Sequence, residues 1–117
     1  MTSRQLEDYL QDILDAIIAA QQFVADMSFE EFISDQKTIF AVTRAIEIVG
    51  EATKNIPPSI RNIYPQVQWK SIAGMRDKMI HQYFGVNLRV LWDTVHQDLP
   101  TLEPIIAKIL KDLSNFQ

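Results

Sequence analysis

The sequence contains no cysteine and only two histidines among its 117 residues. Without thiols, a disulfide framework, a thiolate zinc site and a cysteine nucleophile are all excluded. His81 and His96 leave little material for a metal centre. The sequence therefore predicts chemistry that uses neither a metal nor another cofactor.

Long apolar segments are also missing. The longest uncharged run near the N-terminus, residues 16–25, is too short to cross a bilayer. No basic segment followed by an apolar one opens the chain, as it would in a signal peptide. We therefore expect one cytoplasmic domain over residues 1–117 that does not associate with a membrane.

Charge is distributed unevenly along the chain. The net charge is −4, but residues 1–35 carry one base and eight acids, whereas residues 36–90 carry eight bases and three acids. This central basic segment could contact a polyanion, although solvated helix faces are the simpler interpretation. Its bases are Lys37, Arg44, Lys54, Arg61, Lys70, Arg76, Lys78 and Arg89.

Apolar residues recur every three or four positions, which is typical of amphipathic helices. The spacing predicts a helix over about residues 4–26, and a second one that starts after a capping box at Ser28 and ends before Pro57. An irregular connection with one short helical turn should follow over residues 56–70. The next helix is expected over about 71–83, with Ser71 as its N-cap.

The last apolar series runs from Leu88 to Leu113 and has Pro100 and Pro104 inside it. A proline lacks the backbone donor that a helix uses, so we expect either a kink or two stacked helices. No segment alternates as a strand would. The predicted fold class is all-α, an up-and-down bundle of four to five helices.

The most informative stretch is residues 71–85. On an ideal helix Arg76 falls among the apolar residues Ile72, Met79 and Ile80. A guanidinium does not lose its proton, so burial there requires a carboxylate or an anionic ligand. Two acids of the second helix, Glu47 and Glu51, are four residues apart and are candidate structural partners for Arg76.

Three further polar residues accompany Arg76. Asp77 and His81 are four apart, so the carboxylate can orient the imidazole or raise its pKa. Tyr83 follows two residues later. Each residue alone is more often structural, but together they form a denser polar cluster than a core requires. His96, by contrast, reads as a surface residue without a role.

The series Arg76-Asp77-x-x-x-His81-x-Tyr83 resembles the R-x4-H-x-Y motif of HepT-like toxins in the HEPN superfamily. The similarity extends over roughly residues 40–104. Its other blocks are residues 44–52, the approach to the motif at 69–76, Leu91-Trp92 and residues 98–102. The resemblance implies a HEPN-like helical fold.

The resemblance also implies a function. Family members are understood as metal-independent ribonuclease toxins, in which two motifs meet across a homodimer. A nucleotidyltransferase antitoxin silences them by adenylylating the motif tyrosine. Carried over, His81 is the general acid/base, Arg76 binds phosphate, Asp77 is a polar helper and Tyr83 is the modification site. Apart from the resemblance, the basic side chains of Arg44, Lys78 and Arg89 are candidate RNA contacts, because they could feed RNA into a focused cleft despite the acidic net charge.

The predicted ribonuclease site requires two copies of the chain. Arg76 and His81 are separated by ~140° around an ideal helix, so one helix does not bring them together. Pairing two copies would bring an arginine and a histidine together, which makes dimerisation part of the hypothesis.

Two other functions remain open on the sequence. The same dimer cleft could hold a nucleotide or RNA without cutting it and regulate a partner nucleotidyltransferase. A structural adaptor is the third reading, with Arg76 paired to Glu47 or Glu51 in the core.

Overall fold

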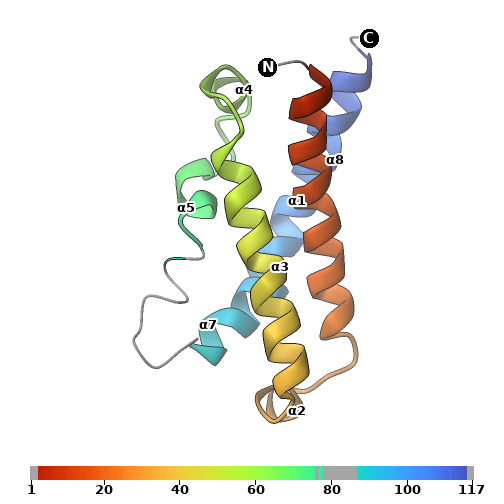
Figure 1. Ribbon diagram of the computed structural model, residues 1–117, viewed down its shortest axis with the longest axis vertical. Helices are drawn as coiled ribbons and strands as arrows, with labels where there is room; N and C mark the ends of the chain where they lie inside the picture. The colour runs from red at the N-terminus through yellow and green to blue at the C-terminus, as the bar shows by residue number, and fades with distance from the viewer. Residues whose placement is uncertain (1–2, 76, 78–86, 116–117) are drawn as a thin grey trace.

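All regular elements in the described part of the chain are helices (Figure 1). The computed structural model describes residues 3–75, 77 and 87–115. Three long helices, α1 (Ser3–Phe23), α3 (Gln36–Lys54) and α8 (Leu99–Asn115), form the body of the bundle, and α1 packs against both α3 and α8. Shorter elements join them: α2 (Phe29–Ile33), α4 (Pro58–Ile63), α5 (Trp69–Ala73), α7 (Leu88–Asp93) and the π-helix η1 (Thr94–Asp98). The predicted all-α class is confirmed.

The apolar residues that recur every three or four positions form one stripe along each predicted helix, and these stripes form the core. Their buried members include Leu10, Ile13, Ile17, Val42, Ile46, Val49, Leu91, Val95, Leu99, Leu102, Ile106 and Ile109. Trp69 joins this core, whereas Phe23 is exposed. None of the described helices combines the length and apolarity needed to span a bilayer.

The helix boundaries differ from those that the spacing of apolar residues predicts. α1 ends at Phe23, three residues before the predicted end, and Asp26 adopts a left-handed conformation with φ 64° in the turn that follows. Aspartate tolerates this conformation better than most residues, and one such residue breaks the helical repeat.

The Ser28 capping box is confirmed, but the helix that it starts is short. Ser28 Oγ accepts a hydrogen bond from Glu31 N (3.1 Å), and Glu31 Oε1 accepts one from Ser28 N (2.9 Å). α2 nevertheless ends at Ile33, and Asp35 caps α3 by accepting from Thr38 N (3.1 Å). The prediction of one helix from Ser28 to Pro57 was wrong, because this second cap starts a new helix.

The Pro57-Pro58 connection contains one short helix, α4, as the sequence predicted. Proline suits the first turn of a helix, where no backbone donor is needed. Arg61 of α4 donates from Nη2 to the Thr53 carbonyl (2.8 Å) and from Nε to the Ile56 carbonyl (2.9 Å). One base of the central segment is therefore used to cap the C-terminal end of α3.

The following helix does not begin where the sequence predicted. α5 starts at Trp69, with Gln68 as its N-cap, so Ser71 lies inside the helix rather than at its N-cap. The Trp69 ring is buried, and its Nε1 donates to the Tyr64 carbonyl (3.0 Å). This anchoring of Trp69 starts the helix two residues early. α5 then ends at Ala73, where Gly74 N donates to the Lys70 carbonyl (3.1 Å).

A polar cluster ties the connection between α4 and α5 to α8. Tyr64 Oη donates to Asp112 Oδ2 (2.6 Å), and Lys108 Nζ donates to the same oxygen (3.0 Å). Burial, together with the bond to Asp112, raises the pKa of Tyr64 to about 12. The same bond, with help from Lys108, lowers the pKa of Asp112. Tyr64 therefore stays a donor and Asp112 an acceptor at neutral pH.

The C-terminal helical segment is continuous through its prolines. The backbone is right-handed helical from α7 through η1 into α8, and Leu99 N donates to the Thr94 carbonyl, five residues back. Pro100 has no N–H, and its ring would crowd the carbonyl four residues earlier, so the helix widens just before it. Two stacked helices, one of the two expected outcomes, are therefore wrong, and in place of a simple kink the structure shows a π-turn within one helical segment.

Candidate functional site

The motif predicted from the sequence lies mostly outside the described residues. Arg76, Lys78, His81 and Tyr83 belong to that part of the chain, as do most residues of the helix expected over 71–83. Asp77 is described and is exposed in a helical conformation. The structure therefore defines the two flanks of the motif, α5 with Met75 on one side and α7 on the other.

The two acids proposed as partners of Arg76 lie on α3, as the sequence predicted. Glu47 is half-buried. Glu51 is exposed, and its Oε1 lies 3.4 Å from Lys54 Nζ, one turn along the same helix. A solvent-exposed ion pair of this kind adds little to stability.

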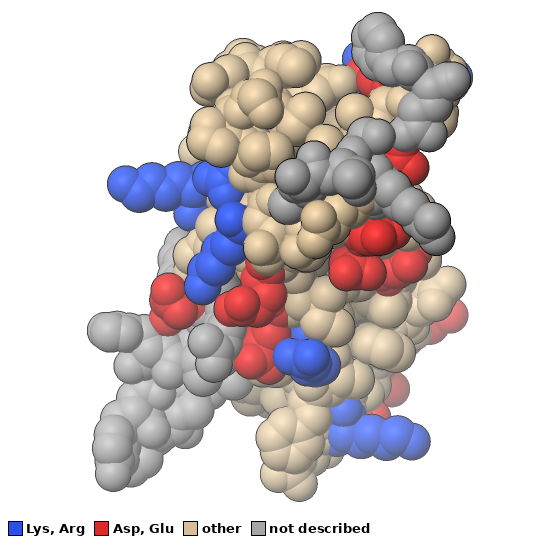
Figure 2. Space-filling view, turned by 45° about the horizontal axis from the view of Figure 1, so that its top comes forward, with Lys and Arg blue, Asp and Glu red and all other residues tan. Residues whose placement is uncertain are grey.

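The described RNA-binding candidates, Arg44 and Arg89, lie on different helices. Arg44 is exposed on α3 and borders a small apolar hollow of about 250 Å³ between α1 and α3. Arg89 is exposed at the start of α7, with Nε 3.4 Å from Asp93 Oδ1 and its guanidinium 4.8 Å from the centre of the Phe29 ring. On the face shown in Figure 2, described basic and acidic side chains are interspersed rather than gathered by sign.

An aromatic cluster supports the start of α7. The Trp92 ring lies 5.7 Å from that of Phe29 and 5.3 Å from the buried Phe32, both on α2. His96 is exposed, as predicted; its ring stacks 4.0 Å from Trp92, and its Nδ1 is 2.8 Å from the Trp92 carbonyl. These contacts fix the helix that immediately follows the motif segment.

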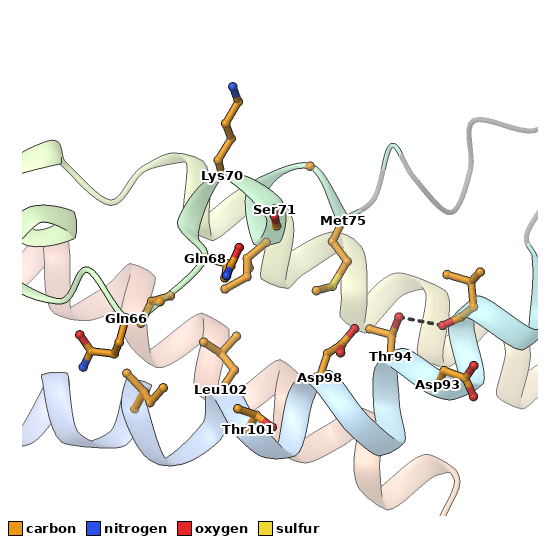
Figure 3. Close-up of a pocket in the computed structure, with 15 residues that line it drawn as sticks. Gln66, Gln68, Lys70, Ser71, Met75, Asp93, Thr94, Asp98, Thr101 and Leu102 are labelled. Atoms are coloured by element: carbon orange, nitrogen blue, oxygen red, sulfur yellow. Dashed lines mark hydrogen bonds between the residues drawn. The ribbon is translucent and has the colours of Figure 1, made fainter.

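A groove of about 750 Å³ lies between α5 and the α7–η1–α8 segment (Figure 3). We call it the α5–η1 groove. Its lining residues are Gln66, Val67, Gln68, Lys70, Ser71, Ile72, Gly74, Met75, Val90, Asp93, Thr94, Asp98, Thr101, Leu102 and Ile105. Met75 directly precedes Arg76 in the sequence. The groove therefore borders the chain where the motif begins.

The groove combines an apolar surface with unengaged polar groups. Ile72 and Leu102 are buried, and Met75 and Ile105 are half-buried. Thr94 Oγ1 donates to the Val90 carbonyl (2.7 Å), and Asp93 pairs with Arg89. Among the described residues, the side chains of Gln68, Ser71 and Asp98 make no hydrogen bond or ion pair. These three remain available to a ligand.

Sequence reasoning missed this groove. Asp93 and Asp98 are five apart and would point in different directions on an ideal helix, ~140° from each other. The π-turn closes its hydrogen bond over five residues and brings such pairs toward one side. Both aspartates consequently line the groove. The only sequence signal was Pro100, which predicted a distortion without predicting its form.

Within the described residues, no three His, Asp or Glu side chains are placed to hold a metal ion. Glu51, predicted as a partner of Arg76, pairs with Lys54, and the groove residue Asp93 pairs with Arg89. Near the motif, the described residues therefore form a groove that combines apolar surface with one unpaired carboxylate, Asp98.

Comparisons with known proteins agree with the family that the motif resembles. The family model for ribonuclease HepT-like proteins matches residues 13–109. A Thermococcus cleftensis protein named “Probable ribonuclease HepT” is 49% identical over 108 residues, covering 92% of this chain and 98% of that protein. A Methanocaldococcus jannaschii protein with RNase in its name is 43% identical over 113 residues, covering 97% of each.

A third relative, from Caldanaerobacter subterraneus and also with RNase in its name, is 45% identical over 103 residues, covering 88% of this chain and 92% of that protein. No solved structure matches the chain significantly. The family match includes the helices on both sides of the motif, as well as the α5–η1 groove. The chain therefore belongs to the HepT-like ribonuclease family.

Proposed function

We propose that this chain is a metal-independent endoribonuclease toxin that acts in the cytoplasm as one half of a toxin–antitoxin pair. The observation that carries the proposal is the coincidence of family membership with the motif at Arg76, His81 and Tyr83. The relatives named as ribonucleases extend over nearly the whole chain. The proposed substrate is RNA.

The proposed reaction uses only side chains. One His81 imidazole removes the proton of a ribose 2′-hydroxyl, and the 2′-oxygen attacks the adjacent phosphorus. Arg76 stabilises the charge that develops on the phosphorane oxygens. A protonated His81 then donates to the departing 5′-oxygen. The products are a 2′,3′-cyclic phosphate and a 5′-hydroxyl end. Asp77 assists by orienting the imidazole.

We propose that the site is formed across a homodimer. A base and an acid are both needed, yet each chain supplies one motif histidine. Two copies related by a two-fold axis supply both, together with two arginines. This arrangement also avoids the poor convergence of residues five apart on one helix.

The test is cleavage of labelled RNA by the purified protein in excess EDTA, followed by analysis of the new ends. We expect cleavage to persist in EDTA and to leave 2′,3′-cyclic phosphates. Activity per chain should fall when dilution dissociates the dimer. Complete loss in EDTA would contradict a metal-independent reaction, and a monomer with full activity would contradict the composite site. A dimer that binds RNA without cutting it would favour the binding-module alternative.

We further propose that a nucleotidyltransferase antitoxin silences the chain by transferring AMP to Tyr83. A phosphodiester on this hydroxyl would place negative charge beside Arg76 and His81, where it would compete with the RNA phosphate. The Tyr83→Phe variant, incubated with the partner enzyme and ATP, should gain no mass and stay active. Wild type should gain the mass of one or more AMP groups and lose cleavage. The control is Tyr9→Phe, a half-buried tyrosine on α1, which should be silenced like wild type. Equal silencing and labelling of Tyr83→Phe would disprove the proposed acceptor.

A further inference from the structure

We propose that the α5–η1 groove binds one unpaired nucleobase of the RNA substrate, and that Asp98 makes it prefer bases that carry an exocyclic amino group. The inference rests on the proposed ribonuclease function and adds a substrate preference to it. It uses only described residues on the two walls of the groove.

The groove is large enough to admit a nucleobase, and its lining suits a flat aromatic ring. Its volume of about 750 Å³ lies within the usual range for ligand sites, ~300–1,000 Å³. Side chains from both walls contribute apolar surface: Ile72 and Met75 from the α5 side, and Leu102 and Ile105 from α8. Apolar surface on two sides matches the two faces of a base, whose polar atoms lie at its edge.

Asp98 determines which edge of a nucleobase the groove accepts. Its carboxylate is exposed at the end of η1 and has no partner among the described residues. In Figure 3 it points from η1 toward the α5 side of the groove. An ionised carboxylate only accepts hydrogen bonds, so it matches the amino groups of guanine, cytosine and adenine. Uracil has no amino group, and its one ring donor, N3–H, lies between two carbonyl oxygens that a carboxylate would repel.

The charges also set the orientation of the nucleotide. Asp93 and Asp98 line the groove and would repel a phosphate placed inside it. Lys70 stands at the edge, where Figure 3 shows its side chain directed away from the groove. It makes no ion pair among the described residues. The base would therefore enter, while the backbone phosphate stays outside near Lys70.

The position along the chain places this base beside the scissile bond. Met75 lines the groove, and the proposed phosphate-binding Arg76 is the next residue. Because Met75 and Arg76 are consecutive, a base in the groove and a phosphate bound by Arg76 would belong to the same nucleotide or to neighbouring ones. The preference should accordingly appear at one position next to the cut.

The direct test is binding of oligonucleotides that cannot be cut. Five-residue RNAs with 2′-O-methyl groups throughout, either all uridine or with guanosine, cytidine or adenosine at the centre, are titrated by fluorescence anisotropy. We expect wild type to bind at least one amino-bearing oligonucleotide about 10-fold more tightly than all-uridine, the discrimination that one good base contact provides. Asp98→Asn should reduce this ratio to below about 2-fold, because an amide also donates to uracil.

The matched control is Asp12→Asn, which removes the same charge from an exposed site on α1 outside the groove. It should keep the wild-type ratio. An unchanged ratio in Asp98→Asn, or no base preference and no binding in wild type, would overturn the proposed subsite. Thermal unfolding of both variants should match wild type, since both carboxylates are exposed.

A second arm uses the unmodified oligonucleotides and measures cleavage in EDTA. Base preference in binding that depends on Asp98, without any cleavage, would retain the subsite and refute the proposed ribonuclease function. Cleavage whose base preference is the same in wild type and Asp98→Asn would retain the function and refute the subsite. Loss of preference in both arms of Asp98→Asn, with cleavage by wild type, is the result we expect.

Discussion

Replacing His81 with alanine should lower the rate of RNA cleavage by at least about 100- to 10,000-fold, the contribution of a single general acid or base. In the proposed homodimer both the base and the acid are copies of this histidine, so one substitution removes both. The measurement is single-turnover cleavage of a labelled RNA in EDTA, with the variant at saturating concentration. RNA binding should change far less than the rate.

The chain provides a matched control in His96. This histidine is exposed on η1 and stacks on Trp92, so His96→Ala removes the same group from outside the proposed site. It should cleave within about 2-fold of wild type. A His81→Ala protein that kept its activity, or equal losses in both variants, would refute the assignment of His81.

Arg76→Ala separates catalysis from the adaptor alternative. In the ribonuclease, the variant loses cleavage while the unfolding midpoint is largely retained. In the adaptor, the half-buried carboxylate of Glu47 loses its partner, and the free energy of unfolding falls by up to ~3–5 kcal/mol, the upper value being that of a fully buried pair. Comparing the denaturation curve with the cleavage rate distinguishes the two outcomes.

Phe32→Ala should lower the free energy of unfolding by ~3–5 kcal/mol, the cost of removing a buried phenylalanine and leaving a cavity. Phe32 is fully buried and its ring lies 5.3 Å from Trp92. It thereby joins α2 to α7. Because domains have a total stability of only ~5–15 kcal/mol, a large part would be lost. Urea unfolding followed by tryptophan fluorescence measures the change in midpoint.

Phe40 is the control for this substitution, since it is 65% exposed on α3. Phe40→Ala should change the free energy of unfolding by less than ~0.5 kcal/mol. If Phe32→Ala were as stable as Phe40→Ala, the packing of α2 against α7 would be incorrect. At temperatures where Phe32→Ala is still folded, its cleavage rate reports whether α2 also positions the motif segment through α7.

Much of the fold follows from the spacing of apolar residues. Each long helix buries one apolar stripe, and these stripes together form the core. The stripes of α1, α3 and α8 predicted the core almost residue by residue. Boundaries were less predictable, since they depend on single competing interactions. Asp35 restarts the helix after α2, and the buried Trp69 moves the start of α5 ahead of Ser71.

The candidate site likewise has one part that the sequence predicted and one part that it did not. The motif is contiguous, so its residue types and spacing could be read directly. The α5–η1 groove is not, because its walls come from segments about 20 residues apart in the sequence and from a π-turn that no spacing rule anticipates. The sequence therefore did not identify Asp98 as a candidate ligand-binding residue, although the nearby Pro100 predicted a distorted helix.

The π-turn also determines where this helix resists bending least. Pro100 and Pro104 cannot donate backbone hydrogen bonds, so two rungs of the α-helical ladder are missing within one and a half turns. Stiffness in a helix comes largely from that ladder. The compliant section coincides with one wall of the groove, whereas α1 and α3 are uninterrupted. A bend at η1 would move one wall of the groove, but Val95 and Leu99 of the same section are buried in the core, so their packing opposes the motion that the missing hydrogen bonds would permit.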